Sequence, residues 1–348
     1  MILLYASLAL IISFYLLAHI CDDYFVIALD KVANKLKMSS DVAGATLMAI
    51  GSSAPEFFVS MIAVLKPGDY AAIGLGTIVG SALFNLLVII GVSAIVKNTV
   101  LTWQPVFRDG LFYVLSILVL LWVFQDGQIN LLEACSLIFL YVIYVIFVMN
   151  WQKILPYDAE IQNEEGEEEK ECKKSAWQRI FTPFEFILSK IFLPNKYYVG
   201  NFFISILLIG FLSWVLVESA IVISTILHIP QAIIALTVLA IGTSMPDLIS
   251  SVIVAKQGRG SMAICNALGS NIFDILIGLG VPWLIIIFYT ESLQVSQDNL
   301  LTSIILLLGS VIILFSILLV KKWKIGRGTG FLLVGIYLAY LLWAIFSI

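Results

Sequence analysis

Charged side chains are scarce in this sequence. Asp, Glu, Lys and Arg make up 12% of the 348 residues, whereas a soluble domain carries about 25%. Hydrophobic residues make up 61%, and they gather into long apolar runs separated by short charged clusters. A helix that spans a bilayer needs roughly 20 apolar residues, and this alternation is typical of such helices. The lack of charge therefore excludes an ordinary soluble globular protein.

Histidine and cysteine are also few, with two and four copies in the chain. Cys21, Cys135, Cys172 and Cys265 lack metal-site spacing, and they lie in or beside different apolar segments. We therefore expect free thiols rather than a disulfide framework, and no resident cofactor.

The apolar runs predict an all-α polytopic membrane protein of about ten transmembrane helices. They divide the chain into a first five-span half (1–150), a linker (151–198) and a second five-span half (199–348). The linker carries the acidic run NEEGEEEKE at 163–171, which is too polar to pack and lacks the ligand spacing of an EF-hand loop. The expected spans are 2–20, 41–64, 70–96, 109–125, 129–150, 200–226, 231–255, 260–288, 299–320 and 329–347.

The basic residues predict the orientation of these spans. With the N-terminus outside, eighteen Lys and Arg residues, Arg108 among them, fall in inward-facing segments, and Lys66 alone falls outside. Such a bias follows the positive-inside rule. We therefore expect both termini outside, the linker in the cytoplasm, and a location in the plasma membrane. The expected partners are the lipid bilayer and inorganic cations, with neither nucleic acid nor an obligate protein partner.

Two motifs recur in the two halves. The segment TLMAIGSSAPE at 46–56 returns as TVLAIGTSMPD at 237–247, and GSALFN at 80–85 returns as GSNIFD at 269–274. Because each half has an odd number of spans, the second copy enters the membrane from the opposite side. Inverted repeats of this kind are associated with secondary transporters.

The first motif predicts a broken helix in each half. Gly and Pro within four residues weaken a membrane helix, and freed carbonyls are tolerated only where they are buried or line a cavity. A carboxylate follows each break, and a charge at that depth is expensive and functional by default. All candidate ligands are oxygens, which suit calcium and sodium rather than zinc or copper. These candidates are Glu56, Asp247 and Asp274, the side chains of Ser52, Ser53, Ser81, Asn85, Thr243, Ser244 and Ser270, and the carbonyls of Ala49 and Ala240.

A structural interpretation competes at several positions. Ser and Thr in membrane helices often bond only their own backbone, and the small residues Gly74, Gly76 and Gly80 are typical of close helix packing. Glu218 has no counterpart in the first half, so we expect an interfacial or packing role for it. Glu133 and His19 lie near span ends, where a functional role is less expected still.

The sequence resembles the cation/calcium exchanger superfamily, whose repeats carry a G-[ST]-S-x-P-[ED] core, and within it the potassium-dependent sodium/calcium exchangers. The resemblance implies alternating access, in which two thin helices slide against an ion-binding core. It also implies ion ligands at Ser52, Ser53, Glu56, Ser81, Asn85, Thr243, Ser244, Asp247, Ser270 and Asp274. The stretches that carry it are CDDYFV at 21–26, DVAGAT at 41–46, GSSAPE at 51–56, GTIVGS at 76–81, LTWQPVFRD at 101–109, GSNIFD at 269–274 and GVPW at 280–283.

A charge count favours the potassium-coupled branch. Glu56, Asp247 and Asp274 sum to −3 when ionised, and one calcium with one potassium brings +3. A protonated carboxylate would make potassium superfluous, so a potassium-independent sodium/calcium exchanger stays open, as does a calcium/proton exchanger. An intramembrane aspartyl protease is disfavoured because its Gly-x-Gly-Asp stretch is absent, and inverted repeats favour a carrier over a channel. We therefore expect an ion transporter and not an enzyme.

Overall fold

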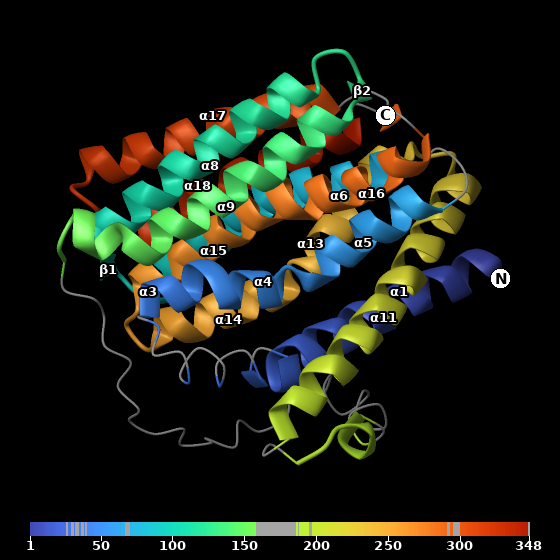
Figure 1. The fold of residues 1–348 in the computed structure, drawn as a ribbon, viewed down its shortest axis with the longest axis horizontal. Helices are drawn as coiled ribbons and strands as arrows, with labels where there is room; N and C mark the ends of the chain where they lie inside the picture. The colour runs from blue at the N-terminus through green and yellow to red at the C-terminus, as the bar shows by residue number, and fades with distance from the viewer. Residues whose placement is uncertain are drawn as a thin grey trace.

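The computed structural model is a bundle of helices (Figure 1). It describes residues 1–25, 27–28, 31, 35, 38, 40–66, 70–157, 186, 188–194, 197–290, 293–294 and 300–346. In the first half the helices are α1 (Ile2–Ile20), α3 (Ser40–Ala43), α4 (Ala49–Ser52), α5 (Ala54–Leu65), α6 (Ala71–Phe84), α7 (Ile90–Val96), α8 (Trp103–Val123) and α9 (Leu131–Ile154). In the second half they are α11 (Tyr198–Leu227), α12 (Gln231–Ile234), α13 (Ala240–Thr243), α14 (Met245–Lys256), α15 (Gly260–Phe273), α16 (Gly280–Thr290), α17 (Leu300–Val320) and α18 (Arg327–Phe346).

The described helices confirm the prediction of about ten spans. Eight are long and apolar enough to cross a bilayer, and two further pairs of shorter helices each make one bent span. Two short antiparallel ribbons close the ends of the bundle. They pair β1 (Thr99–Val100) with β4 (Lys324–Ile325), and β2 (Gln128–Ile129) with β3 (Leu293–Gln294). The acidic run at 163–171 lies outside the described residues.

The inverted repeat is visible in the backbone. The chain bends by 52° between α4 and α5 and by 42° between α13 and α14, at the two Gly-Pro motifs. A π-helical segment precedes each bend: η2 (Gly44–Met48) in the first half and η5 (Ala235–Leu239) in the second. A second pair, η3 (Asn85–Ile89) and η6 (Asp274–Leu279), begins at the last residue of the second motif. A π-bulge often marks a functional site.

The two halves pack crosswise through glycines at the second motif. A Cβ atom built on Gly80 would lie 2.6 Å from the Cβ of Ala240 and would also overlap the carbonyl of Leu236. A Cβ on Gly269 would lie 2.9 Å from the carbonyl oxygen of Ala45. α6 therefore lies directly against the bent span of the second half, and α15 against that of the first. Small residues permit this close approach of helix backbones.

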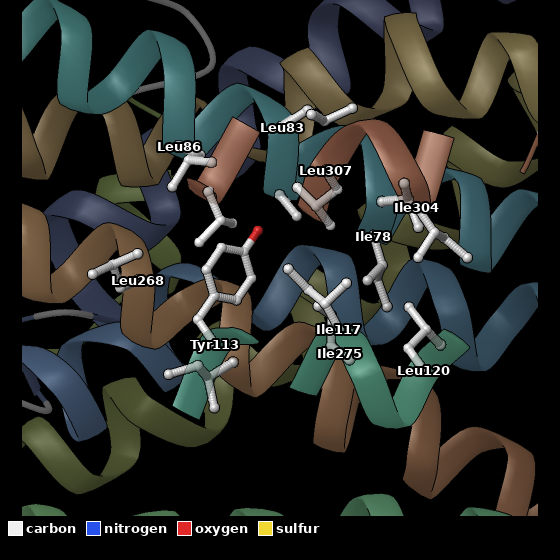
Figure 2. Packing of buried hydrophobic residues seen from close by; sticks show 14 of the residues in the cluster. Ile78, Leu83, Leu86, Tyr113, Ile117, Leu120, Leu268, Ile275, Ile304 and Leu307 are labelled. Atoms are coloured by element: carbon white, nitrogen blue, oxygen red, sulfur yellow. The ribbon is translucent and has the colours of Figure 1, made fainter. Parts of the chain in front are cut away.

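The buried apolar residues form two main clusters. The larger one joins α6, α7, α8 and α9 to α15, α16, α17 and α18, and Figure 2 shows part of it around Ile117, Ile275 and Leu307. The other joins α1 and α11 to α5 and η5. In Figure 1, α1 and α11 cross at one side of the bundle, away from α8 and α17. The α1–α11 pair thus packs on the bent spans from one side.

The predicted start of the fourth span was wrong. Residue 109 was expected to begin it and Arg108 to lie in a loop, but α8 begins at Trp103 and the side chains of Arg108 and Asp109 are fully buried. The Arg108 guanidinium donates from Nε to Asp109 Oδ1 at 2.7 Å and from Nη2 to Oδ2 at 3.0 Å. The two hydrogen bonds of this bidentate pair let the adjacent charges lie together inside the helix bundle, where either charge alone would be strongly disfavoured.

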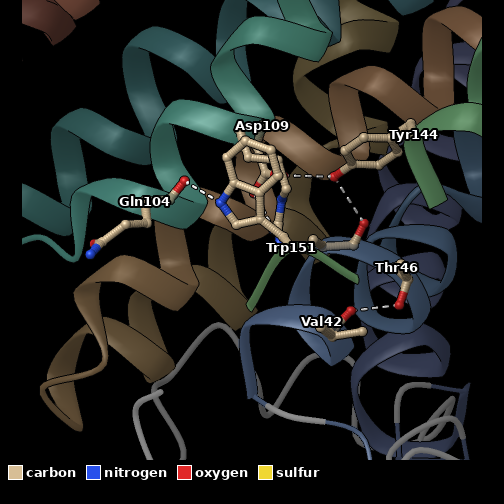
Figure 3. A network of polar contacts seen from close by, with 8 residues as sticks. Val42, Thr46, Gln104, Asp109, Tyr144 and Trp151 are labelled. Carbon is tan, nitrogen blue, oxygen red and sulfur yellow. Dashed lines mark hydrogen bonds and ion pairs between the residues drawn. The ribbon is translucent and has the colours of Figure 1, made fainter. Parts of the chain in front are cut away.

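A polar network extends this ion pair to the neighbouring helices (Figure 3). The Tyr144 hydroxyl on α9 donates to Asp109 Oδ1 at 3.1 Å and lies 3.4 Å from the carbonyl oxygen of Ala45 in η2. The Trp151 indole donates to the carbonyl of Gln104 at 3.1 Å. The network therefore fastens α8 and α9 to the start of the first bent span.

The glycine contacts make a testable prediction about stability. Gly80→Ala should destabilise the protein by about 1–3 kcal/mol, since the added methyl overpacks the α6–η5 contact. Gly309→Ala is the matched control, because a Cβ at Gly309 on α17 meets no atom within 4 Å. Thermal unfolding in detergent measures both. Equal midpoints for the two variants would show that the close approach does not constrain the packing.

The buried ion pair makes a second prediction. Asp109→Asn leaves the Arg108 guanidinium buried without its counterion, which costs about 3–5 kcal/mol. The double variant Arg108→Met with Asp109→Leu removes both charges and should recover much of that loss. Denaturation midpoints of the two variants decide the matter, and a double variant less stable than Asp109→Asn would contradict this account.

Candidate functional site

Three acidic side chains meet at the interface between the two halves. Glu56 lies in the first turn of α5, Asp247 in the first turn of α14, and Asp274 at the start of η6. All three are 0% exposed. Glu56 interacts electrostatically with Asp247, and Asp274 interacts with both. The bends therefore bring together carboxylates that lie up to 218 residues apart in the chain.

Two of the carboxylates accept hydrogen bonds from the opposite half. The Ser244 hydroxyl donates to Glu56 Oε1 at 3.1 Å, and the Asn85 amide donates from Nδ2 to Asp247 Oδ2 at 3.0 Å. Asp274 faces Ser53. The side chains of Ser52, Ser270 and Asn266 also surround Asp247, and that of Thr243 lies beside Glu56. The predicted residues of both repeats thus form one site.

Several buried oxygens of this site accept no hydrogen bond from the described residues. They are Glu56 Oε2, Asp247 Oδ1, both Asp274 oxygens, Asn85 Oδ1 and Ser53 Oγ. A buried polar atom without a partner costs free energy comparable to a lost hydrogen bond, and an isolated charge costs far more. The ion pairs seen between described residues, such as Lys66–Glu218 and Arg108–Asp109, lie elsewhere and do not neutralise this site. An oxygen-rich, acidic and fully buried cluster of this kind is suited to bind cations.

The predicted hydroxyls mostly donate to their own helices. Ser52 and Thr243 donate to the carbonyls of Met48 and Leu239, while Ser81 and Ser270 donate to those of Ile78 and Ala267. Such back-bonding uses the hydrogen and leaves the oxygen lone pairs available to a cation.

The carbonyls of Ala49 and Ala240 are not freed by the breaks in the way the sequence suggested. They accept the N–H groups of Ser53 at 3.0 Å and Ser244 at 3.3 Å. The Ala49 carbonyl also lies 3.4 Å from the hydroxyl of Ser52, whereas a carbonyl has two lone pairs and that of Ala240 keeps one for a further contact. The backbone leaves helical geometry one turn later, with φ −87° and ψ 3° at Ser53 and φ −82° and ψ 4° at Ser244.

Among the residues that the structure describes, no three His, Cys, Asp or Glu side chains have the geometry of a metal site. A cation that contacts one or two of these carboxylates would complete its coordination with neutral oxygens. Calcium accepts such mixed oxygen ligands, and Asp274 is then available for a second cation.

Sequence reasoning missed three polar residues beside the site. Asn271 and Asn266 on α15 and Tyr113 on α8 are all fully buried. Asn271 accepts a hydrogen bond from Asn85 at 2.9 Å, and Asn266 donates to Ser251 at 3.2 Å. For Asn271 the sequence did contain a signal, which is a departure from the repeat: Asn271 stands where the first half has Ala82.

The three ionisable residues expected to lie outside the site, Glu218, Glu133 and His19, do so. Glu218 on α11 forms an ion pair with Lys66 at the end of α5, and both side chains are partly exposed. Glu133 forms a capping box with Asn130 at the start of α9. His19 lies 2.7 Å from Asp23. These contacts support packing and capping roles for the three predicted side chains.

Known proteins with similar sequences or folds point to one class of transporter. The profile of the family described as "Sodium/calcium exchanger protein" matches residues 6–150 and 197–346. The sodium/potassium/calcium exchanger 5 of Homo sapiens is 30% identical over 95% of this chain and 81% of the relative. The sodium/potassium/calcium exchanger 4 of Mus musculus is 29% identical over 95% of this chain and 79% of the relative. The fold matches the solved structure of the sodium-calcium exchanger NCX_Mj with a TM-score of 0.63, at 24% identity and 98% coverage of both chains.

Proposed function

Because the chain belongs to the sodium/calcium exchanger family, we propose that it is a secondary active antiporter that exchanges Na⁺ for Ca²⁺ and carries K⁺ with Ca²⁺. The observation that carries the proposal is the set of buried oxygens without partners, which both halves contribute between the two bends. Glu56 and Asp247 supply the charge of the calcium position. Ser52, Ser53, Ser81, Thr243, Ser244, Ser270 and the carbonyls of Ala49 and Ala240 supply neutral oxygens around it.

Sodium competes for the same oxygens. It accepts the hard oxygen ligands that calcium accepts but brings one charge instead of two, so the carboxylates favour calcium while the neutral oxygens serve both ions. Occupation by turns, rather than together, is what coupled exchange requires. Two sites that each bound one ion permanently would not couple the sodium gradient to calcium movement.

Potassium is proposed from charge and from position. Three ionised carboxylates carry −3, and one calcium with one potassium restores neutrality. Both Asp274 oxygens lack a partner among the described residues, and Asp274 faces Ser53, whose hydroxyl also lacks one. We assign the potassium position to this pair. Support also comes from the curated relatives, which are named sodium/potassium/calcium exchangers.

Alternating access fits the division of the apolar core. The α1–α11 pair packs through its own apolar cluster, separate from the cluster that joins α8 and α9 to α17 and α18. Motion of this pair along the bent spans would open the site first to one side of the membrane and then to the other. The inverted repeat gives the site two equivalent access paths, one to each side of the membrane.

The transporter is an integral membrane protein, and we propose the plasma membrane as its location. Arg108 leaves the count of inward-facing basic residues because its side chain is fully buried in α8, so the basic bias becomes seventeen to one (18 − 1 = 17). That bias still favours external termini and a cytoplasmic linker.

Removing either carboxylate of the calcium position tests the site. Glu56→Gln and Asp247→Asn keep side-chain volume and remove one charge, so calcium affinity should fall on the order of a hundredfold or more. Glu218→Gln is the matched control, since this membrane carboxylate is paired with Lys66 outside the site. Calcium flux per correctly folded transporter in proteoliposomes measures all three. Loss of flux in Glu218→Gln equal to that in Glu56→Gln would contradict the assignment.

Asp274 separates potassium coupling from simple sodium/calcium exchange. Its counterpart in the first half is Asn85, so Asp274→Asn makes the halves match and lowers the site charge from −3 to −2. The variant should still exchange sodium for calcium, but without needing potassium. Calcium uptake with potassium replaced by choline, in both proteins, is the measurement. Wild-type calcium uptake that does not depend on potassium would remove potassium co-transport from the proposal and leave sodium/calcium exchange.

A further inference from the structure

A tyrosine outside both repeat motifs is connected to the ion site by hydrogen bonds. Tyr113 lies on α8 with no exposed surface, among apolar neighbours such as Leu268 and Ile117 (Figure 2). Its hydroxyl lies 3.0 Å from Nδ2 of Asn271 on α15. A buried tyrosine hydroxyl requires a partner, and here the partner is an amide one step from the candidate ligands.

A backbone carbonyl fixes the orientation of the Asn271 amide. Nδ2 of Asn271 donates to the carbonyl oxygen of Ala82 at 3.0 Å as well as to the Tyr113 hydroxyl. A carbonyl can only accept, so the NH₂ end of Asn271 must face it. Both hydrogens of that NH₂ group are then used. The oxygen of Asn271 consequently faces the opposite way, toward Asn85.

The orientation of Asn85 follows from that of Asn271. Nδ2 of Asn85 lies 2.9 Å from Asn271 Oδ1, 3.0 Å from Asp247 Oδ2 and 3.3 Å from Ser270 Oγ. Two hydrogens serve these three acceptors, of which Ser270 is the most distant. Oδ1 of Asn85 is left buried without a partner. The contacts with Asn271 and Asp247 therefore together determine which end of the Asn85 amide is available to a cation.

We propose that Tyr113 and Asn271 are positioning residues that hold the Asn85 amide with its oxygen toward the transported cations. This inference rests on the proposed exchange function and adds to it a role for α8. Without this series of hydrogen bonds from Tyr113 and Ala82 through Asn271 to Asn85 (the relay), only Asp247 Oδ2 and the more distant Ser270 Oγ would hold the NH₂ group of Asn85, and the amide could turn more readily to present that group to the ions. An NH₂ group repels a cation where an oxygen would bind it.

The relay also accounts for the one charge difference between the halves. Oδ1 of Asn271 accepts a hydrogen bond from residue 85, so residue 85 must carry a donor. An ionised aspartate at position 85 would instead place two hydrogen-bond acceptors against each other. In the other half, the residue equivalent to Asn271 is Ala82, which presents no side-chain acceptor. A carboxylate is therefore compatible with position 274, whereas position 85 requires an amide.

Tyr113→Phe tests the relay because it removes only the hydroxyl. Asn271 keeps its contact with Ala82 but loses one acceptor, so half-saturating calcium should rise about three- to tenfold while maximal flux per folded transporter changes less. Tyr144→Phe is the matched control: Tyr144 is also fully buried and its hydroxyl is bonded to Asp109, but it has no contact with Asn271. Half-saturating calcium should stay near the wild-type value in this control.

Three results would overturn the proposal. The first is wild-type half-saturation in Tyr113→Phe, and the second is an equal rise in both variants, which would indicate a general effect of core packing. The third is a change confined to potassium half-saturation, because Tyr113 also interacts electrostatically with Asp274 and the hydroxyl would then belong to that side chain.

A double-variant cycle tests whether Tyr113 acts through Asn271. Asn271→Leu removes the whole relay, and in that background Tyr113→Phe should cause no further rise in half-saturating calcium. Additive rises would show that the two side chains act independently. Calcium-dependent thermal stabilisation in detergent gives the same half-saturation without transport. A wild type that binds calcium but does not exchange it would therefore defeat the proposed function while leaving the relay testable.

Discussion

Electrostatic repulsion among Glu56, Asp247 and Asp274 is the constraint on which the rest of the structure depends. Three carboxylates lie buried in the interface between helices, and no described lysine or arginine forms an ion pair with them. Burying charges without counterions costs several kcal/mol each. The protein offsets part of that cost with hydroxyl and amide donors, and cations at the proposed positions would supply the remainder. A site that cations would stabilise, with two bent helices around it, is suited to bind ions and to release them.

The backbone around this site is built to bring distant residues together. The two Gly-Pro bends place Glu56 and Asp247 at the starts of α5 and α14, while Gly80 and Gly269 allow α6 and α15 to approach the opposite half. The π-helical segments begin or end beside these positions. The same geometry occurs twice, so an opening on one side has an equivalent on the other. Symmetry explains the shared ligands, and the differences at positions 82, 85, 271 and 274 explain the charge.

Much of this arrangement could be predicted from the sequence because its causes are local. Apolar runs determine the spans, a Gly-Pro pair weakens a helix, and a repeated motif implies a repeated geometry, so eight long spans and the two bent pairs agree with the prediction of about ten. The clustering of Glu56, Asp247 and Asp274 also followed from the repeat. Arg108 was misplaced because its partner is adjacent in the chain, and a charge count cannot distinguish a buried pair from a loop. Tyr113 and Asn271 were missed because their contacts depend on how α8 and α15 pack, which no local pattern records.

The central claim is that this site couples opposite movements of sodium and calcium. Calcium uptake by wild-type protein in proteoliposomes, driven first by an outward sodium gradient and then by a pH gradient alone, tests it most directly. We predict accumulation under the sodium gradient, reversal to efflux when that gradient is reversed, and no response to the pH gradient. Uptake that followed the pH gradient and ignored sodium would contradict it.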